Sequence, residues 1–469
     1  MYQIDFTHPI HIHFIGIGGI SMSGLAELLH TKGFTVTGSD QKMSKITEHL
    51  QRLGIECTSG HHAETITDGI DLIVYTAAIH TDNQEYQAAI AKNIPMMDRA
   101  TLVGQVMKQY KNAISIAGTH GKTTTTSMVS LMMLEGDMDP TISVGGILDN
   151  IEGNIRIGES DNFIVESCEY KNSFLSFHPT HEIILNIEAE HLDFFKDITD
   201  IRQSFKTFAQ KLPAFGNLVI NSEIPDYEEI TKDLQCHVIT YGILPGKTNL
   251  DSITCPYTYA AANITYNEYG CGSYDLIRNN EYLTRIDLGV VGRHNISNSI
   301  AAIALVDRLG VSVDAMKSAL IKFTGTERRF QKKGVVGGVT IIDDYAHHPT
   351  EIKATLTAAK SYPHNQLWVV FQPHTYSRTK ALFHDFIDAL SLADNIILAD
   401  IYAAREQDPG DISSEDLQKK LVENHKNAYY IPNFEDIQNF LLKKCTNGDL
   451  LITMGAGDVV SIGESLLRR

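Results

Sequence analysis

The sequence predicts an α/β protein of three consecutive domains, because strands alternate with helices in three separate stretches of the chain. In the first, an apolar strand at 11–16 leads into a glycine-rich turn and a helix with an apolar face. In the second, a strand near Ile114 leads into another glycine turn and helix, and in the third, strands and helices alternate from Val339 onward. We place the domains at residues 1–110, 111–324 and 325–469.

The first and third domains are predicted to be Rossmann-like. After the first glycine turn, strands at 34–40 and 70–75 continue a βαβ pattern, and a helix at 102–110 ends the domain. The third domain has a regular alternation that predicts a parallel sheet, with strands at 339–345, 366–371, 395–400 and 449–453.

The central domain is predicted to contain a mixed sheet. Its apolar strands lie at 162–166 and 182–187, and helices at 296–309 and 313–323 close it. Between them, the stretch 250–287 is rich in Tyr, Asn, Gly and Thr, which favours short antiparallel strands.

A phosphate-binding loop connects the first strand and helix of the central domain. Glycines allow backbone N–H groups to face an anion, Lys122 neutralises phosphate oxygens, and the hydroxyl of Thr123 is able to hold Mg²⁺. The spacing is shorter than that of the standard P-loop, and a Gly-Lys-Thr tripeptide alone is often an ordinary loop. The strand before it and the helix after it favour an ATP site in a P-loop ATPase domain. We assign ATP binding to Gly118, Thr119, His120, Gly121, Lys122, Thr123 and Thr124.

The N-terminal glycine turn is a second candidate for a diphosphate group at a helix N-terminus. Gly16, Gly18 and Gly19 fit the turn, but Ser21 stands where the dinucleotide fingerprint has a glycine. Asp40 ends the next strand and is placed to accept hydrogen bonds from a ribose or a base. The residues leave open NAD, a UDP-sugar, or a tight turn without a ligand.

Carboxylates follow two strands of the central domain. Glu166 ends one strand, and the segment 186–193 after the other contains three carboxylates and His191. Such a cluster beyond strand ends suits a divalent metal, and a solvated acidic loop is the alternative. We expect Thr123, Glu166 and His191 to bind Mg²⁺.

Polar clusters also follow the later strands. The amide of Asn295 is suited to reading an adenine edge, although it is equally a candidate helix cap. Arg328 and its neighbour Arg329 stand at the junction of the second and third domains, where they are able to reach phosphates. Two strand ends offer further groups, namely Asp344, Tyr345 and His348 after one and Arg378 after the other.

The composition excludes several classes of function. With 57 Asp and Glu against 39 Lys and Arg, the chain is not expected to bind nucleic acid. The six cysteines form no C-x-x-C pair, so free thiols in a reducing compartment are expected. We see no signal peptide and no apolar run near the ~18 residues that span a bilayer. A cytoplasmic protein without membrane insertion is therefore expected.

These motifs together resemble those of the Mur ligase family along the whole chain. The most specific are Gly16–Gly24, Gly118–Thr125, Asn186–His191, His294–Asn298, Asp343–Pro349, Phe371–Thr379 and Thr453–Asp458. The resemblance implies an N-terminal domain for a UDP-sugar, a central ATPase and a C-terminal domain that closes on an amino acid. It implies an ATP-driven amide bond between the lactyl carboxylate of UDP-N-acetylmuramate and the amine of L-alanine, by a monomer or weak homodimer.

The resemblance also implies roles for particular residues. Lys122, His191, Arg328 and His348 would be catalytic, and Asn295, Asp344 and Tyr345 would join the ATP site. Gly16, Gly18, Gly19, Asp40 and Arg378 would bind the UDP-sugar. Three alternatives stay open: a ligase that attaches a tripeptide to the same sugar, a dinucleotide-dependent oxidoreductase, and a nucleotide-binding switch.

Overall fold

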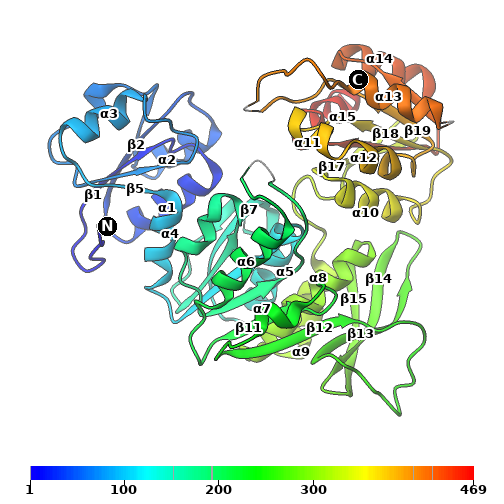
Figure 1. The fold of residues 1–469 in the computed structure, drawn as a ribbon, viewed down its shortest axis with the longest axis horizontal. Coiled ribbons are helices and arrows are strands. Elements are labelled where there is room, and N and C mark those ends of the chain that lie inside the picture. The colour runs from blue at the N-terminus through cyan, green and yellow to red at the C-terminus, as the bar shows by residue number, and fades with distance from the viewer. Residues whose placement is uncertain (1, 152, 192–193, 405, 425, 469) are drawn as a thin grey trace. The chain divides into compact units, whose positions relative to one another are not determined.

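The computed structural model describes residues 2–151, 153–191, 194–404, 406–424 and 426–468, whose strands form three sheets (Figure 1). The predicted α/β class, with Rossmann-like first and last sheets and a mixed central sheet, is confirmed. The chain divides into two compact units. The first comprises Met1–Gly242, Tyr257–Tyr259 and Ala301–Met316, and the second Ile243–Pro256, Ala260–Ile300 and Lys317–Arg469.

The first unit contains a fully parallel five-stranded sheet with the order β3-β2-β1-β4-β5. The order changes direction between β1 and β4, which is the place where open α/β sheets bind ligands. The strands are β1 (His11–Ile15), β2 (Thr35–Asp40), β3 (Glu56–Ser59), β4 (Leu72–Tyr75) and β5 (Met96–Asp98). The helices are α1 (Ile20–Thr31), α2 (Lys45–Arg52), α3 (Gln84–Ala91) and α4 (Arg99–Met107).

The same unit contains most of the central sheet, with the order β12-β11-β10-β6-β9-β7-β8. Its strands pair in parallel except for the β7–β8 hairpin. The strands are β6 (Asn112–Ala117), β7 (Thr141–Leu148), β8 (Gly153–Arg156), β9 (Asn162–Ser167), β10 (His181–Ile184), β11 (Asn217–Asn221) and β12 (His237–Ile243). The helical segments are α5 (Lys122–Glu135), η3 (Tyr170–Ser176), α6 (Ile198–Ala209) and α7 (Tyr227–Thr231).

The second unit contains strands β13 (Tyr259–Tyr266), β14 (Cys271–Arg278) and β15 (Glu281–Val291), of which β14 and β15 pair antiparallel as the composition predicts. Its six-stranded sheet has the order β16-β17-β21-β18-β19-β20 and is parallel apart from the β16–β17 hairpin. These strands are β16 (Gln331–Val336), β17 (Val339–Asp344), β18 (Leu367–Phe371), β19 (Asn395–Leu398), β20 (Asn427–Tyr430) and β21 (Leu450–Met454).

The inner strands β18 and β21 of the last sheet are buried on both faces and contribute to two separate apolar clusters, so helices cover both sides of this sheet. These helices are α10 (Pro349–Ala359), α11 (Tyr376–Ala381), α12 (Phe383–Leu390), α13 (Ser414–Glu423), α14 (Phe434–Lys444) and α15 (Val460–Leu467). Helices α8 (Arg293–Arg308) and α9 (Val313–Lys322) precede this sheet. Among the described residues, no helix has the length and apolar composition needed to cross a membrane.

Helix α4 packs against η3 at a glycine, because a Cβ on Gly104 would lie 1.9 Å from the carbonyl oxygen of Ser176. We expect Gly104→Ala to lower the free energy of unfolding by about 2 kcal/mol, the usual cost of overpacking. Urea denaturation followed by circular dichroism measures this loss. Gly153→Ala is the matched control, since no atom lies within 4 Å of its Cβ position. Equal stability of both variants would contradict the proposed contact.

A ladder of polar side chains crosses the amino-terminal edge of the central sheet. Asn217 donates to Nδ1 of His181 at 3.0 Å, and Nε2 of His181 lies 3.3 Å from Oδ1 of Asn112. Asn112 donates in turn to Asn162 at 2.8 Å. Since Nδ1 accepts, the ring of His181 carries its proton on Nε2 and is neutral. Burial lowers the pKa of His181 to about 4.

The lowered pKa of His181 predicts a pH dependence of stability. In the unfolded chain, His181 has its ordinary pKa of 6.5, so between pH 6.5 and pH 4 it binds a proton that it does not bind in the folded protein. The contribution of His181 is therefore complete above pH 6.5 and is lost as the pH falls toward 4. The free energy of unfolding of the parent protein should fall when the pH is lowered from 7.5 to 5. In His181→Gln, we expect this fall to be smaller by about 2 kcal/mol. The exposed His237 provides the control His237→Gln, which should follow the parent.

Candidate functional site

The phosphate loop between β6 and α5 depends on two glycines with positive φ. Gly118 has a φ of +144°, and a Cβ there would lie 3.0 Å from Cβ of Leu185. Gly121 has a φ of +83° and precedes the first residue of α5. Side chains at these positions would strain the backbone, so the glycines set the path that brings the loop to the helix N-terminus.

Asn186 fixes the loop from the segment that follows the neighbouring strand, β10. Its Oδ1 accepts from the backbone N–H of His120 at 2.7 Å, and its Nδ2 donates to the carbonyl oxygen of His120 at 3.0 Å. The hydroxyl of Thr119 accepts from the N–H of Glu188 at 2.9 Å. The predicted strand at 182–187 ends earlier, at Ile184, and this allows Asn186 to turn toward the loop.

Lys122 lies at the start of α5 with its ammonium group surrounded by acceptors. It donates to the carbonyl oxygens of Gly118 and Thr119 and, at 3.2 Å, to Oε2 of Glu169. Burial alone would lower the pKa of Lys122, but Glu169, Cys168 and Glu166 together outweigh burial and the pKa is raised. Lys122 is therefore a cation held against the loop, which suits it to bind phosphate oxygens.

Thr123 and Glu166 form a pair of oxygen donors at the N-terminus of α5. The hydroxyl of Thr123 donates to Oε2 of Glu166 at 3.1 Å, and the N–H of Gly145 donates to Oε1 of Glu166 at 2.6 Å. A Cβ on Gly145 would lie 2.7 Å from Oε2 of Glu166, so a side chain there would displace this carboxylate. A hydroxyl beside a carboxylate is a ligand set that Mg²⁺ prefers, and these residues fit that ion.

His191 lies near a different carboxylate. Its Nε2 is 3.9 Å from Oε1 of Glu169, and its ring packs on Tyr170 with centroids 4.6 Å apart. Asp193, the last acid of the predicted cluster, lies outside the described residues. The described contacts thus join Thr123 to Glu166, and His191 to Glu169.

The N-terminal glycine turn is closed by the aspartate predicted to bind a ribose or base. Oδ2 of Asp40 accepts from the N–H of Gly18 at 2.9 Å, a distance that a Cβ on Gly18 would disturb. Gly16 has a φ of +85°, and Gly19 caps α1 without a side-chain hydrogen bond. Arg99, which sequence reasoning missed, donates to the hydroxyl of Ser21 at 2.9 Å and adds a partly buried cation at this helix start.

In the second unit, Arg328 forms an ion pair with a buried carboxylate. Its Nε donates to Oδ2 of Asp343 at 3.0 Å, and its Nη2 donates to the carbonyl oxygen of Gly455 at 2.7 Å. Thr453 donates to the other oxygen of Asp343 at 2.7 Å. Arg328 thereby connects the ends of β17 and β21, a contact that favours a positioning role.

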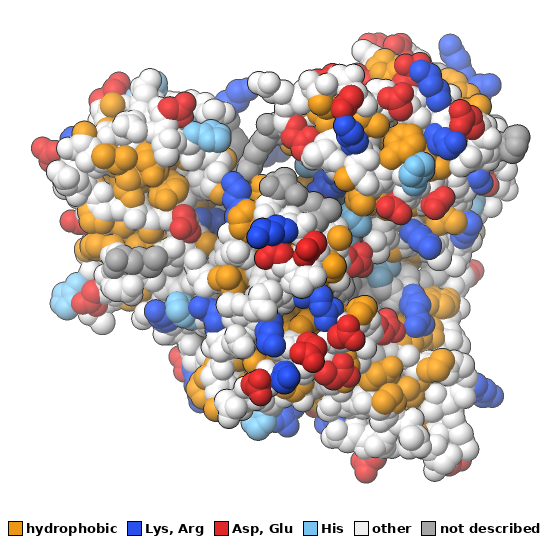
Figure 2. Space-filling view, in the orientation of Figure 1, with side chains coloured by type: hydrophobic (Ala, Val, Ile, Leu, Met, Phe, Trp, Pro, Cys, Tyr) orange, Lys and Arg blue, Asp and Glu red, His pale blue; other side chains and the backbone are white. Residues whose placement is uncertain are grey.

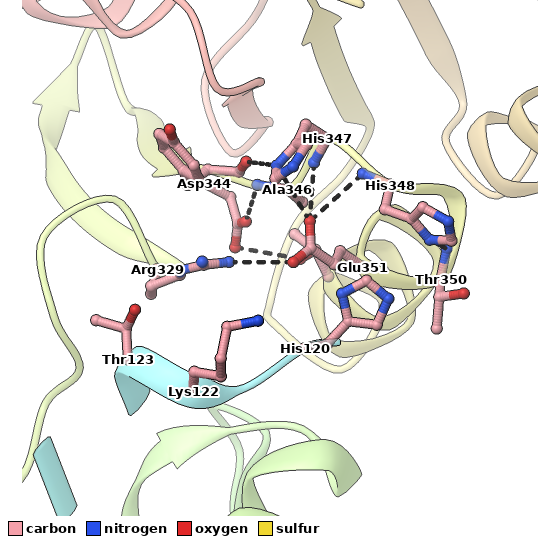
Figure 3. A network of polar contacts seen from close by, with 12 residues as sticks. His120, Lys122, Thr123, Arg329, Asp344, Ala346, His347, His348, Thr350 and Glu351 are labelled. Carbon is pink, nitrogen blue, oxygen red and sulfur yellow. Dashed lines mark hydrogen bonds and ion pairs between the residues drawn. The ribbon is translucent and has the colours of Figure 1, made fainter. Parts of the chain in front are cut away.

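Glu351 organises the loop that follows β17. Figure 3 shows its carboxylate between Arg329 and the backbone N–H groups of His347 and His348. Both guanidinium groups, of Arg328 and Arg329, lie over the ring of Tyr345, 5.0 and 5.4 Å from its centre. Two positively charged groups therefore lie over the ring of Tyr345, an arrangement that suits an anionic ligand.

Asp344 and His348 hold the same loop together. The carboxylate of Asp344 accepts from the N–H groups of Phe330 and Ala346, and burial raises its pKa to about 6. His348 caps α10, since its Nδ1 accepts from the N–H of Thr350 at 3.3 Å. A neutral His348 consequently has its proton on Nε2.

The two remaining predicted residues of this unit are also tied to their neighbours. Asn295 donates to the carbonyl oxygen of Val291 at 2.8 Å and accepts from Asn298 at 3.2 Å, at the start of α8. Arg378 lies 3.1 Å from both the ring and the carbonyl oxygen of His374, whose ring stacks on Tyr402.

Comparisons with known proteins agree over the whole chain. The model of the Mur ligase family, catalytic domain, matches residues 11–111, that of the Mur ligase middle domain matches residues 116–306, and that of the Mur ligase, glutamate ligase domain, matches residues 328–457. The chain is 67% identical to the UDP-N-acetylmuramate–L-alanine ligase of Lachnoclostridium phytofermentans, with 100% of both chains covered. The chain belongs to the Mur ligase family.

This Mur ligase is also similar to other ligases. It is 58% identical to the UDP-N-acetylmuramate–L-alanine ligase of Lachnospira eligens, with 100% of each chain covered. The crystal structure of UDP-N-acetylmuramate–alanine ligase from Thermotoga maritima has a TM-score of 0.81 and 28% identity, with 98% of this chain and 99% of that chain covered. A murein peptide ligase from Psychrobacter arcticus shares the fold, with a TM-score of 0.71 and 22% identity over 98% of each chain.

For this Mur ligase, sequence reasoning missed Glu169 and Glu351. A signal for Glu169 exists, because it stands three residues after Glu166, just beyond the end of the same strand. Glu351 stands at the third position of α10, where a carboxylate is able to accept from the backbone before the helix. Both are acids in ordinary helix-start or strand-end positions, and only their contacts distinguish them.

Proposed function

We propose that this Mur ligase joins L-alanine to UDP-N-acetylmuramate at the expense of ATP. The observation that supports this most is the 67% identity, over the full length of both chains, to a UDP-N-acetylmuramate–L-alanine ligase. The phosphate loop with Lys122 at the start of α5 supports the use of ATP.

The reaction consists of two displacements. An oxygen of the lactyl carboxylate attacks the γ-phosphorus, the bond to the β-phosphate oxygen breaks, and ADP leaves, giving an acyl phosphate. The alanine amine then attacks the acyl carbon, the bond to the phosphate oxygen breaks, and the amine loses a proton. In such reactions the protein contributes mainly positioning and charge stabilisation.

The proposed site residues fall into groups according to the ligand that each would bind. Gly118–Thr124 bind the phosphates of ATP, Lys122 holds the transferred phosphoryl group, and Asn295, Asp344 and Tyr345 belong to the nucleotide site. Gly16, Gly18, Gly19, Asp40 and Arg378 bind the UDP-sugar. Of the proposed catalytic set, His191 is the better candidate for the amine proton, because the Nδ1 lone pair of His348 is already occupied by Thr350. The ion pair of Arg328 favours a positioning role for it.

The proposed domains are 1–110 for the UDP-sugar, 111–324 for ATP and 325–469 for the amino acid. We place the protein in the cytoplasm, where ATP and nucleotide sugars are available, as a monomer or weak homodimer.

Among the described residues on the face seen in Figure 2, Lys and Arg are interspersed with Asp and Glu. This mixed surface is consistent with small-molecule substrates.

Thr123 and Glu166 would hold Mg²⁺, with His191 as a further proposed ligand. When bound, the ion neutralises charge on phosphate oxygens. We expect Glu166→Gln to raise the Mg²⁺ concentration for half-maximal rate by about tenfold and to lower the maximal rate, because a neutral amide binds Mg²⁺ more weakly. Steady-state rates across a Mg²⁺ titration measure this change. An unaltered Mg²⁺ dependence would return Glu166 to a structural role.

The decisive assay measures ADP formation with ATP, Mg²⁺ and UDP-N-acetylmuramate, and detects the amide product by mass spectrometry. L-alanine should be the preferred acceptor over L-serine, glycine and a cell-wall tripeptide. A preference for the tripeptide would favour the peptide-attaching relative. ATP hydrolysis without any amide product would indicate a nucleotide switch. In a separate assay with NADH and without ATP, NADH oxidation would indicate an oxidoreductase.

A further inference from the structure

The ammonium group of Lys122 has all of its hydrogen-bonding capacity in use within the protein. An ammonium donates three hydrogen bonds, and Lys122 has three acceptors: the carbonyl oxygens of Gly118 and Thr119, and Oε2 of Glu169. A phosphate oxygen therefore gains a hydrogen bond from Lys122 only by displacing one of these acceptors.

The three acceptors differ in kind. The two carbonyl oxygens belong to the phosphate loop itself, within three or four residues of Lys122, and Asn186 fixes that loop from the segment after β10. Glu169 comes from the segment after β9 and carries a full negative charge. It is the one of the three that competes with phosphate by the same charge-assisted chemistry.

Glu169 is held firmly where it stands. It is only 2% exposed, and its carbonyl oxygen accepts from the N–H of Asn172 at 2.8 Å in a tight turn. Two residues of that turn, Lys171 and Asn172, have φ values of 54° and 56°, in the left-handed region. The hydroxyl of Ser204 on α6 donates to the side chain of Asn172 and anchors the turn.

The second oxygen of Glu169 is directed toward the same site. Oε1 is buried, has no hydrogen-bond partner in the described structure, and lies 3.9 Å from Nε2 of His191. One carboxylate thus has an oxygen near each of two proposed catalytic side chains. A residue that only supported the fold would not need to lie close to both Lys122 and His191.

We propose that Glu169 is a positioning residue that competes with the phosphates of ATP for Lys122. Lys122 exchanges this carboxylate for a phosphate oxygen when nucleotide binds, so part of the binding free energy is used to break the ion pair. The same pair keeps the ammonium charged and aimed at the loop. This inference rests on the proposed function, since it takes the ligand of the loop to be ATP.

The competition predicts an unusual result for Glu169→Gln. Removing the charged competitor should tighten the binding of ATP, measured by calorimetry in excess EDTA, by about tenfold, the value of a hydrogen bond to a charged group. The turnover number should fall, because Lys122 is no longer oriented. A merely structural role would weaken binding and turnover together. Glu169→Asp, which keeps the charge, should bind ATP more like the parent.

Two further variants separate competition from a general charge effect. Glu188→Gln removes a carboxylate that lies 3.5 Å from His120, in the same loop region, and should change metal-free ATP affinity by less than twofold. In a Lys122→Met background, Glu169→Gln should no longer tighten binding, because the two residues act as a pair.

Each outcome decides the proposal. Tighter binding by Glu169→Gln that disappears in the Lys122→Met background supports it. Unchanged or weaker binding overturns it, as does tightening that persists without Lys122 or that Glu188→Gln reproduces. Failure of the parent protein to bind ATP would overturn both this inference and the proposed function, whereas normal binding with no effect of Glu169→Gln would overturn this inference alone.

Discussion

Lys122→Met is expected to lower the turnover number by at least about 100-fold while the protein remains folded. The substitution removes a cation aimed at the phosphoryl group, and loss of one such preorganised donor typically costs 10²–10³ in rate. Methionine keeps the length and apolar stem of the side chain, so the start of α5 should persist. Initial rates of ADP formation at saturating substrates measure the effect.

Circular dichroism and the urea midpoint provide the control for Lys122→Met. The spectrum should stay near that of the parent, whereas the urea midpoint should fall, because Glu169 is left as a buried carboxylate without its cation. Adding Glu169→Gln removes the stranded charge and should recover part of this loss. A variant that retains half of the parent rate would remove Lys122 from the mechanism.

Arg328→Ala is expected to destabilise the C-terminal sheet by about 3 kcal/mol, because it leaves Asp343 as a buried carboxylate without its cation. Asp343 is fully buried at the end of β17, and Arg328 also bonds Gly455 beyond β21. The only tryptophan of the chain, Trp368, lies buried in β18 of this sheet. Urea denaturation followed by tryptophan fluorescence therefore reports on this part of the molecule.

Arg329→Ala is the matched control for Arg328→Ala. Arg329 also lies over Tyr345, but its ion pair with Glu351 spans 3.5 Å and is more exposed to solvent. We expect it to cost less than about 1 kcal/mol. If the two variants lost equal stability, the buried ion pair would not be the cause, and a direct part of Arg328 in catalysis would again be favoured.

The fold class could be predicted from local patterns alone. Continuous apolar runs such as 367–371 and 396–398 are typical of strands buried on both faces, and glycine turns before helices place the βαβ units. The phosphate loop is equally local, because strand, glycines, lysine and helix start follow one another within about fifteen residues. For such features, neighbours in sequence are also neighbours in space.

Only the tertiary structure decided which hydrogen-bond partner each polar side chain has. The sequence presents Asp40, Asp344 and Arg328 as groups available to a ligand, yet each is bonded to a backbone group or a buried partner. Glu169, which looks ordinary in the sequence, is the carboxylate that holds Lys122. Residue types determine which bonds are possible, but the choice among them depends on segments that are 14 to 127 residues apart. Burial then fixes that choice, because a polar group that is no longer in contact with water must keep the hydrogen-bond partner that the fold provides.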